Sequence, residues 1–263
     1  MTINVMVNGI PGKMASCAAL RLAKNNLFNL VAFSLSDGNA GEEYSLGERR
    51  FKLVRPGARH LLPNFDGIAV DFTIPDAVEG NVDFYCNRGM SFVLGTTGAD
   101  RAKIEARVRN SDVCCVISPN MAGEIVGFQA MIKYLGENFP GLFKSYSFEI
   151  EESHQHGKKD VSGTALRMLE DFARLGVEVK EIKKIREVEK QREIGVPEEH
   201  LEGHAWHRYT IRSDSVMLEF RHNVNGREVY AKGTEQAVIY LDKKVREGNR
   251  KQVYSMIDVI SQR

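Results

Sequence analysis

The 263-residue chain has little cysteine, and its four cysteines lack the spacing of a disulfide framework or of a metal site. Cys17, Cys86, Cys114 and Cys115 form no CxxC pair, so we expect reduced and mostly buried thiols. The chain also lacks an excess of charge of one sign, because 36 Lys and Arg residues face 35 Asp and Glu residues. Without an overall basic field, nucleic acid is not an expected partner.

The sequence has no long hydrophobic run, since no stretch approaches the roughly 18 apolar residues that cross a membrane. Residues 1–12 show neither a basic segment followed by an apolar run nor a small-residue cleavage pattern. We therefore expect a cytoplasmic protein with no membrane partner, and a plastid location only if a transit peptide has been removed. With 43% hydrophobic residues, the chain can form one large core or two smaller ones, and its expected partners are small molecules and copies of itself.

Short apolar runs alternate with helical stretches in the first half of the chain. The expected strands are residues 3–7, 30–35, 68–72, 91–94 and 113–117, and the expected helices are residues 13–24, 76–88 and 99–109. This alternation is typical of βαβ units, and short apolar strands fit a parallel sheet that is covered on both faces. The first half therefore predicts a Rossmann-like, doubly wound α/β domain.

After Pro119 the pattern changes to that of a mixed α+β domain with an open mixed sheet. The expected elements are a helix at about 122–137, a strand at 145–151, a helix at 164–175, and antiparallel strands at 206–212, 216–222 and 227–231, with charged sequence over 178–200. The last thirty residues look helical, and we expect part of them to pack on the first domain. We assign residues 1–121 and about 235–263 to dinucleotide binding, and about 122–234 to substrate binding and oligomerisation.

Glycines follow the first strand in the pattern of a phosphate-binding turn. Gly9, Gly12 and Ala15 give G-x-x-G-x-x-A before a helix, where amides and the positive end of the helix dipole can hold a pyrophosphate. Lys13 adds a positive charge. Glycines are also common in ordinary α/β turns, but the position at the start of a βαβ series favours the functional interpretation.

The end of the second expected strand bears on the choice of cofactor. An NAD-binding fold usually ends this strand in Asp or Glu, whose carboxylate binds the ribose 2′-hydroxyl. Here the sequence has Ser34, Leu35 and Ser36, which removes repulsion against a 2′-phosphate. This favours NADPH, with NADH still possible because Asp37 lies one residue further on.

Residues 152–165 concentrate polar side chains just before a helix. Glu152, His154 and Lys158 precede a Ser-Gly-Thr turn at Ser162–Thr164, whose hydroxyls and free amides suit a carboxylate. A plain helix cap is the alternative interpretation of this turn.

This segment resembles the signature of the dihydrodipicolinate reductases, E-x-H-[HQ]-x-x-K-x-D-x-(x)-S-G-T-A. Further stretches in the same order resemble other parts of the family pattern. Gly9, Gly12, Lys13 and Met14 resemble its first turn, and Asp71, Phe72, Thr73 and Pro75 resemble its D-F-T-x-P segment. Gly95, Thr96, Thr97 and Gly98 resemble its nicotinamide loop, Ser118, Pro119, Asn120 and Met121 its domain-junction loop, and His222, Arg227 and Gly233 its C-terminal substrate region. The resemblance spans about residues 3–241. Gln155 in place of a second histidine, and one residue fewer between Asp160 and Ser162, make the chain more similar to the plant-type branch.

The resemblance implies that dihydrodipicolinate, formed from 4-hydroxy-tetrahydrodipicolinate, is reduced to tetrahydrodipicolinate on the diaminopimelate route to lysine. The nicotinamide would lie over Gly95–Gly98 and deliver hydride to C4 of the cyclic dicarboxylate, with His154 and Lys158 as catalytic candidates for the following protonation. The implied cofactor-binding residues are Gly9, Gly12, Lys13, Met14, Ser34, Ser36, Phe72, Thr73, Gly95, Thr96, Thr97, Ser118, Asn120 and Met121. The implied substrate-binding residues are Gln155, Ser162, Gly163, Thr164 and Arg227, although Arg227 also fits a surface salt bridge. A homodimer or homotetramer is expected.

A cluster of three histidines raises the alternative of a metal site. His200, His204 and His207 stand near Glu199 and Glu202, but no HExxH or CxxC accompanies them, so we expect polar loop residues and no metal.

Cysteine and the dinucleotide turn suggest two further alternatives. Cys114 or Cys115 would be the nucleophile of a semialdehyde dehydrogenase, although an apolar strand favours inert thiols. A dinucleotide-sensing module without catalysis would have no use for His154 and Lys158.

Overall fold

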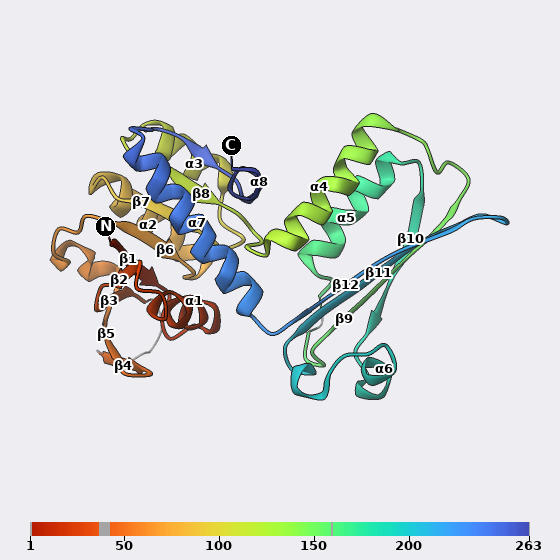
Figure 1. Cartoon of the computed structure of the whole chain (residues 1–263), viewed down its shortest axis with the longest axis horizontal. Helices are drawn as coiled ribbons and strands as arrows, with labels where there is room; N and C mark the ends of the chain where they lie inside the picture. The colour runs from red at the N-terminus through yellow and green to blue at the C-terminus, as the bar shows by residue number, and fades with distance from the viewer. Residues whose placement is uncertain (1, 37–42, 159, 263) are drawn as a thin grey trace. The chain divides into compact units, whose positions relative to one another are not determined.

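The computed structural model describes residues 2–36, 43–158 and 160–262. The chain divides into two compact units: Met1–Val126 with Glu228–Arg263, which we call unit 1, and Gly127–Arg227, which we call unit 2. Each unit is described by itself (Figure 1). Among the described helices, none has the length and apolar character needed to cross a membrane.

Unit 1 is built on a six-stranded sheet in which all neighbouring strands are parallel, in the order β13-β8-β7-β6-β1-β2. Its strands are β1 (Ile3–Asn8), β2 (Phe28–Leu30), β6 (Ile68–Asp71), β7 (Ser91–Leu94), β8 (Cys115–Ile117) and β13 (Val253–Tyr254). Two groups of helices cover it: α1 (Lys13–Ala23), α7 (Glu228–Arg246) and α8 (Met256–Ser261) share one core, and α2 (Pro75–Asn87) and α3 (Arg101–Arg109) share another.

The side chains of β1 explain why both faces are covered. Val5 and Val7 belong to the core under α1 and α7, whereas Met6 belongs to the core under α2 and α3. Because successive side chains of a strand point to opposite faces, an apolar strand needs a helix layer on each side. The doubly wound α/β fold is confirmed.

The expected strand at 30–35 is wrong as a single element. β2 ends at Leu30 beside β1, and β3 (Phe33–Leu35) pairs instead with β5 (Arg49–Val54) in a three-stranded sheet, β3-β5-β4. The strand changes partner at Val31, whose amide donates to the Val5 carbonyl, and Ala32, whose carbonyl accepts from the Lys52 amide.

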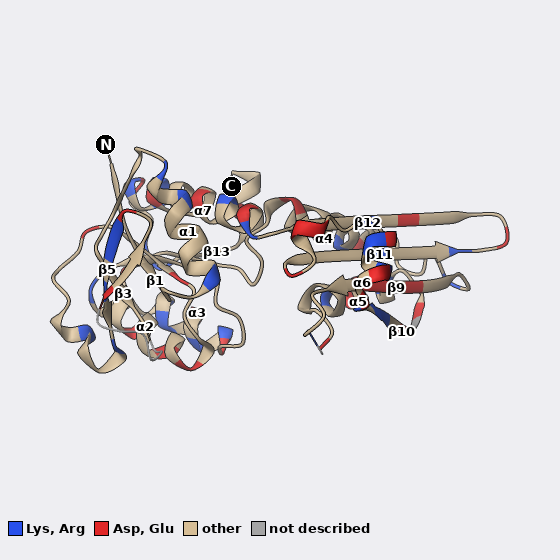
Figure 2. Ribbon diagram, turned by 90° about the horizontal axis from the view of Figure 1, so that it is seen from below, with Lys and Arg blue, Asp and Glu red and all other residues tan. Residues whose placement is uncertain are grey.

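The antiparallel pair of β4 (Glu43–Leu46) and β5 was not expected from the sequence. β5 exposes Arg49, Arg50 and Lys52 and buries Phe51 and Leu53. The blue colour on β5 in Figure 2 marks its basic residues. A strand with this much charge has a weak hydropathy signal, and so the pattern of apolar runs missed it. A 3-10 turn, η1 (Pro56–Leu61), follows β5.

Unit 2 is a four-stranded mixed sheet in the order β10-β9-β11-β12. Its strands are β9 (Ser147–His154), β10 (Glu178–Ile185), β11 (His204–Arg212) and β12 (Met217–Asn225), and its helices are α4 (Gly123–Asn138), which begins in unit 1, α5 (Gly163–Arg174) and α6 (Val188–Glu193). β9 and β10 are parallel, and β11 is antiparallel to both β9 and β12. Ile132 of α4 and Phe172 of α5 share one core with Ile150 and Tyr209 of the sheet. The expected mixed α+β unit is confirmed.

Three expectations about the second half are corrected. Residues 227–231 do not form a strand, because α7 starts at Glu228 and buries Ala231, Val238 and Leu241 at helical spacing. The charged stretch 178–200 contains β10, α6 and a 3-10 turn, η2 (Glu198–His200). The helical tail after residue 250 is in fact β13 followed by the short α8.

Candidate active site

The glycine turn after β1 leaves no room for side chains. Gly9 has φ +100°, and a Cβ there would lie 2.4 Å from the Phe72 carbonyl oxygen. The Gly12 amide donates to the Gly9 carbonyl at 2.7 Å, and α1 begins at the next residue, Lys13. A tight turn that feeds directly into a helix N-terminus is the geometry that holds a dinucleotide phosphate.

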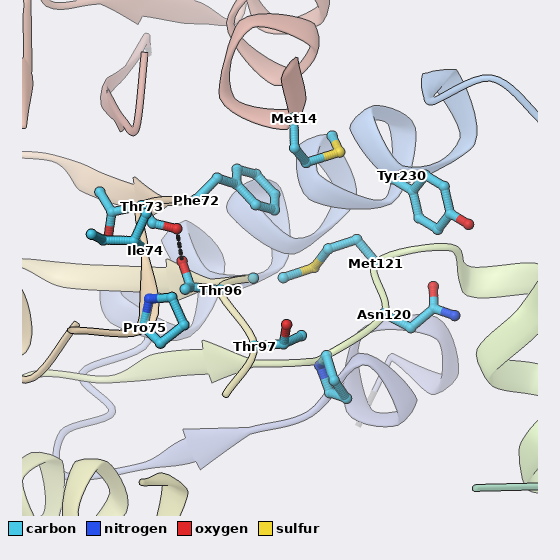
Figure 3. A pocket seen from close by; sticks show the side chains of 12 residues that line it. Met14, Phe72, Thr73, Ile74, Pro75, Thr96, Thr97, Asn120, Met121 and Tyr230 are labelled. Atoms are coloured by element: carbon cyan, nitrogen blue, oxygen red, sulfur yellow. Dashed lines mark hydrogen bonds between the residues drawn. The ribbon is translucent and has the colours of Figure 1, made fainter. Parts of the chain in front are cut away.

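A cavity of about 350 Å³ lies beside this turn in unit 1 (Figure 3). It is lined by residues that follow β6, β7 and β8, together with Met14 of α1 and Tyr230 of α7: Met14, Phe72, Thr73, Ile74, Pro75, Gly95, Thr96, Thr97, Pro119, Asn120, Met121 and Tyr230. Eight of the expected cofactor residues are therefore brought together at the carboxyl end of a parallel sheet, where open α/β folds bind ligands. Tyr230 was missed, because residues 227–231 were taken for a strand.

Close backbone approach also shapes this cavity at Gly95. A Cβ there would lie 2.2 Å from the Phe72 ring, so the strand end and the aromatic ring fit together only without a side chain. At both Gly9 and Gly95 a side chain would collide with Phe72, so packing within unit 1 requires glycine at these two positions.

A buried carboxylate, Asp71, fixes two of the loops around the cavity. Its Oδ1 accepts from the amide and the hydroxyl of Thr73, at 2.9 and 2.6 Å, and from the Thr96 hydroxyl at 3.2 Å. Its Oδ2 accepts from the Tyr85 hydroxyl at 2.7 Å, and burial, followed by the Asp71 charge, raises the pKa of Tyr85. Because Asp71 is fully buried, both loops are tied to one rigid point.

Ser34 and Ser36, which were expected to contact the cofactor ribose or its phosphate, take part in bonds within the protein. Ser34 is fully buried, and its hydroxyl accepts from the Ile10 amide at 3.2 Å, so it supports the glycine turn from within. Ser36 donates its amide to the Val54 carbonyl at 3.0 Å, which places Arg55 next to it at the end of β5. Asp37 lies outside the described residues.

Ser118 serves the neighbouring loop. Its hydroxyl donates to the Asn120 carbonyl at 2.6 Å, and the Asn120 side chain accepts from the Ala122 amide. This pair of short-range bonds fixes the turn that leads to Met121.

In unit 2, His154 ends β9 instead of lying in a loop. Glu152, His207 and His222 form one row across β9, β11 and β12, since His207 is the register partner of both others. The His154 and His207 Nε2 atoms each lie 3.8 Å from Glu152 Oε2. His204 and His207 are thus buried strand residues. His207 lies in the strand expected at 206–212, whereas His204 extends that strand and corrects the loop assignment. The His204 ring binds the Ser153 hydroxyl at 2.7 Å.

Ser162 caps α5 and links it to this row. Its hydroxyl accepts from the Ala165 amide at 3.0 Å and lies 2.8 Å from His207 Nε2, and its amide donates to Glu152 Oε2 at 2.9 Å. Gly163 and Thr164, the first two residues of α5, are not buried. Their amides at a helix N-terminus suit an anion.

Burial sets the charges of this cluster. It lowers the pKa of His154 to about 4, with the Arg186 and Lys158 charges acting in the same direction and Glu152 opposing them. Burial likewise lowers the pKa of His222 to about 4 and that of His207 well below its usual value. Burial raises the pKa of Glu152, but bonds from the Ser162 amide and Arg186 outweigh it, so this carboxylate is ionised beside uncharged rings.

Lys158 follows a tight turn in which its amide donates to the Gln155 carbonyl at 3.0 Å. Both side chains are partly exposed near the end of β9. Arg227, the last residue of unit 2, is exposed, and within the described ranges it makes no ion pair.

Glu152, His154 and His207 also form a group of potential metal ligands, with ligand atoms within 4.8 Å of one another. Glu152 already accepts hydrogen bonds from Ser162 and Arg186, and Lys158 and Arg186 add positive charge. Such surroundings suit an anion better than a cation.

Family models for dihydrodipicolinate reductase cover nearly the whole chain: the N-terminus model matches residues 3–121 and the C-terminus model residues 125–260. The chain belongs to the dihydrodipicolinate reductase family. A probable 4-hydroxy-tetrahydrodipicolinate reductase 2, chloroplastic, of Oryza sativa subsp. japonica is 41% identical over 97% of this chain and 82% of the relative. The 4-hydroxy-tetrahydrodipicolinate reductase 2, chloroplastic, of Arabidopsis thaliana is 42% identical over 98% and 77%. The expected resemblance to plant-type enzymes is confirmed.

Among solved structures, a dipicolinate-bound dihydrodipicolinate reductase from Paenisporosarcina sp. TG-14 has a TM-score of 0.67 and covers 97% of this chain and 98% of its own. At 18% identity this similarity shows the fold. As the N-terminal part of a dihydrodipicolinate reductase family member, unit 1 is a nucleotide-binding domain, which implies NAD(P)H.

Sequence reasoning missed several residues of the two sites. Asp71 and Glu152 stood inside recognised motifs, so their motif positions were a usable signal. Arg55 and Arg186 lie in charged stretches where no element was expected; strand register brings Arg55 beside Ser36 and Arg186 beside the end of β9.

Proposed function

We propose that this chain reduces dihydrodipicolinate to tetrahydrodipicolinate with NADPH, in the diaminopimelate route to lysine. The observation that carries the proposal is the grouping in unit 2 of His154, the Lys158 turn and the α5 N-terminus around Ser162. Membership of the reductase family gives this grouping its substrate class, a small cyclic dicarboxylate. The cysteines support it, since Cys114 and Cys115, the two candidates for the nucleophile of a semialdehyde dehydrogenase, are fully buried and burial raises the pKa of both thiols.

The groups in unit 2 suit a dicarboxylate. The amides of Gly163 and Thr164 and the Thr164 hydroxyl would hold one carboxylate, and Gln155 and Lys158 would bind the other side of the ring. In its chemistry, bound NADPH supplies a hydride for C4 of the ring, and the neighbouring carbon then needs a proton, so that the substrate gains two hydrogens in all.

His154 and Lys158 are the proposed sources of that proton and of the positive charge that stabilises the anionic ring. In the free protein His154 is neutral at pH 7, because its pKa is lowered to about 4. A bound dicarboxylate places negative charge near the ring and therefore raises the pKa of His154. Substrate binding and proton uptake by His154 are thus coupled in this proposal.

The residues at the carboxyl ends of β1, β3 and β5 support a preference for NADPH over NADH. The Gly9 amide donates to the Leu35 carbonyl at 2.8 Å, and Leu35 pairs with Val54, the residue before Arg55. The glycine turn and Arg55 therefore both lie at the carboxyl ends of these strands. A guanidinium there suits a ribose 2′-phosphate. The buried Ser34 acts only by supporting the turn.

A homodimer or homotetramer built through unit 2 is also part of the proposal. β12 is an edge strand of nine residues, and Met217, Glu219, Arg221 and Asn223 point away from the core and are exposed. An exposed edge of this length needs a partner or a cover. A second copy of the chain would supply one.

The direct test is NADPH oxidation with freshly prepared dihydrodipicolinate, followed by identification of tetrahydrodipicolinate by mass spectrometry. We expect turnover that survives blocking of thiols and disappears in Lys158→Ala. NADPH binding without any turnover would favour a sensing module, and activity abolished by a thiol reagent would favour a semialdehyde dehydrogenase.

A further inference from the structure

Arg186 lies just after β10, within the charged stretch to which the sequence assigned no role. Its side chain is 14% exposed, although it carries a full positive charge. All three of its nitrogens donate hydrogen bonds. A nearly buried guanidinium with this many partners is held in one place.

The partners of Arg186 are two separated points of the active-site segment. Nη2 donates to the Glu152 carboxylate at 2.5 Å, and Nε donates to the Lys158 carbonyl at 2.9 Å. The other oxygen of Glu152 accepts from the Ser162 amide at 2.9 Å. The loop between β9 and α5 is therefore hydrogen-bonded to Arg186 near its middle, at Lys158, and to Glu152 at its end, at Ser162. Arg186 and Glu152 are themselves joined by a buried ion pair.

We propose that Arg186 is a positioning residue that fixes the backbone of Lys158 relative to Ser162 and so sets the position of the Lys158 ammonium. The inference rests on the proposed function for the role of Lys158 and extends it to a residue that does not touch the substrate. The turn at Gln155–Lys158 contains Gly157, where an added Cβ would meet nothing within 4 Å, so no packing holds the turn at that point. The His156 ring lies 3.2 Å from the Arg186 carbonyl, so the backbone of residue 186 also contacts this turn, and a change of the Arg186 side chain leaves that contact in place.

A lysine at position 186 could not replace the arginine. One ammonium on a flexible stem can pair with Glu152, but it lacks the planar fork that reaches the Lys158 carbonyl at the same time. Arg186→Lys therefore keeps the buried charge balanced and removes the bond to the Lys158 carbonyl, together with the weaker Nη1 bond to the Glu152 carbonyl within β9. Arg186→Gln removes the charge as well and leaves Glu152 without its cation.

The experiment combines hydrogen–deuterium exchange of the peptide 155–165 with steady-state kinetics and NADPH titration. For Arg186→Lys we expect faster exchange in this peptide only, a kcat lower by about 10- to 100-fold, and an NADPH Kd within about twofold of the original. Arg186→Gln should show a larger loss; if it fails to fold, Arg186→Lys still decides.

Arg192→Gln is the matched control, because Arg192 forms a bidentate pair with Glu198 at 2.7 and 2.8 Å in the same segment but is half exposed. It should change neither exchange nor kcat. Unchanged exchange and kcat in Arg186→Lys would overturn the inference, as would faster exchange with full turnover. A wild-type protein without reductase activity would reject the proposed function, whereas the exchange result would still show whether Arg186 holds the loop.

Discussion

His207 and His222 face each other across β11 and β12, with ring centroids 4.8 Å apart. Both rings are largely enclosed, and neither nitrogen of His222 has a hydrogen-bond partner among the described residues. Two imidazolium ions at this separation would repel each other at a site that also disfavours charge by burial. The pair is therefore compatible with the fold only while it is uncharged.

Protonation of the buried histidines should lower the free energy of unfolding as the pH falls. The folded-state pKa values of His154 and His222 are about 4, below the value of about 6.5 in an unfolded chain, so their contribution is complete above pH 6.5 and is lost as pH falls towards 4. We expect the free energy of unfolding in urea to fall by roughly 3 kcal/mol for each ring over this range. His222→Phe should flatten the slope.

The control for this prediction is His60→Phe, since His60 is exposed in η1 of unit 1. It should keep the slope of the original protein. A His222→Phe variant with an unchanged slope between pH 6.5 and 4 would show that this histidine is not held neutral by the fold.

The candidate site of unit 2 could be named from the sequence only where its residues are neighbours in the chain. Residues 152–164 form one motif, so His154, Lys158 and Ser162 could be named from it. His207 and Arg186 reach the same place through the register of β11 and β10 against β9, which no local pattern encodes. The same limit explains the second strand of unit 1, because tertiary pairing with β5 divided one apolar run into β2 and β3.

Replacing Arg55 tests the basis of cofactor choice. We expect Arg55→Ala to lower kcat/KM for NADPH by about tenfold, or about 1.4 kcal/mol, because a guanidinium–phosphate contact is lost. The value for NADH should not change. Arg49→Ala is the control, since Arg49 begins the same strand that Arg55 follows. A protein that prefers NADH tenfold from the outset would contradict the NADPH assignment itself.

Gly233 tests how α7 supports the cavity of unit 1 in which we propose that the cofactor binds. A Cβ at this helical position would lie 1.6 Å from the Met121 carbonyl oxygen, and Met121 lines the cavity. Helix propensity alone favours Gly233→Ala by about 1 kcal/mol, but overpacking of this kind costs about 1–3 kcal/mol and should win.

The expected result is a lower free energy of unfolding together with weaker NADPH binding, measured by denaturant titration and calorimetry. Gly57→Ala serves as control, because a Cβ at Gly57 would meet nothing within 4 Å. Stabilisation by Gly233→Ala with unchanged NADPH affinity would mean that the helix and the Met121 turn can separate freely.

Assembly is tested at β12, the exposed edge strand of unit 2. Arg221 faces Arg208 across the strands, and Arg208 is already paired with Glu151, whereas in the described part of the chain Arg221 makes no ion pair. Light scattering should show a dimer or tetramer at micromolar concentration, and Arg221→Glu should weaken it. Lys133→Glu on α4 is the control. A monomer for the original protein would reject this assembly.

Substitutions in unit 2 should affect the turnover number without affecting the affinity for NADPH. We expect Lys158→Ala and His154→Ala each to lower kcat by roughly 10²-fold or more, the usual effect of removing a positioned acid or charge. The Kd for NADPH should stay close to its original value, because the glycine turn and the cavity at Thr96 and Met121 belong to unit 1.

Thr164→Val should behave differently from these two variants. Thr164 stands in the first turn of α5, where its hydroxyl would hold a carboxylate that is present before, during and after the reaction. An interaction that is equally strong in the ground state and the transition state affects KM and leaves kcat nearly unchanged. Steady-state kinetics of the three variants, beside calorimetric titration with NADPH, separate the two roles. If Lys158→Ala kept the original turnover, Lys158 would have no part in the chemistry, and the positioning assigned to Arg186 would lose its purpose.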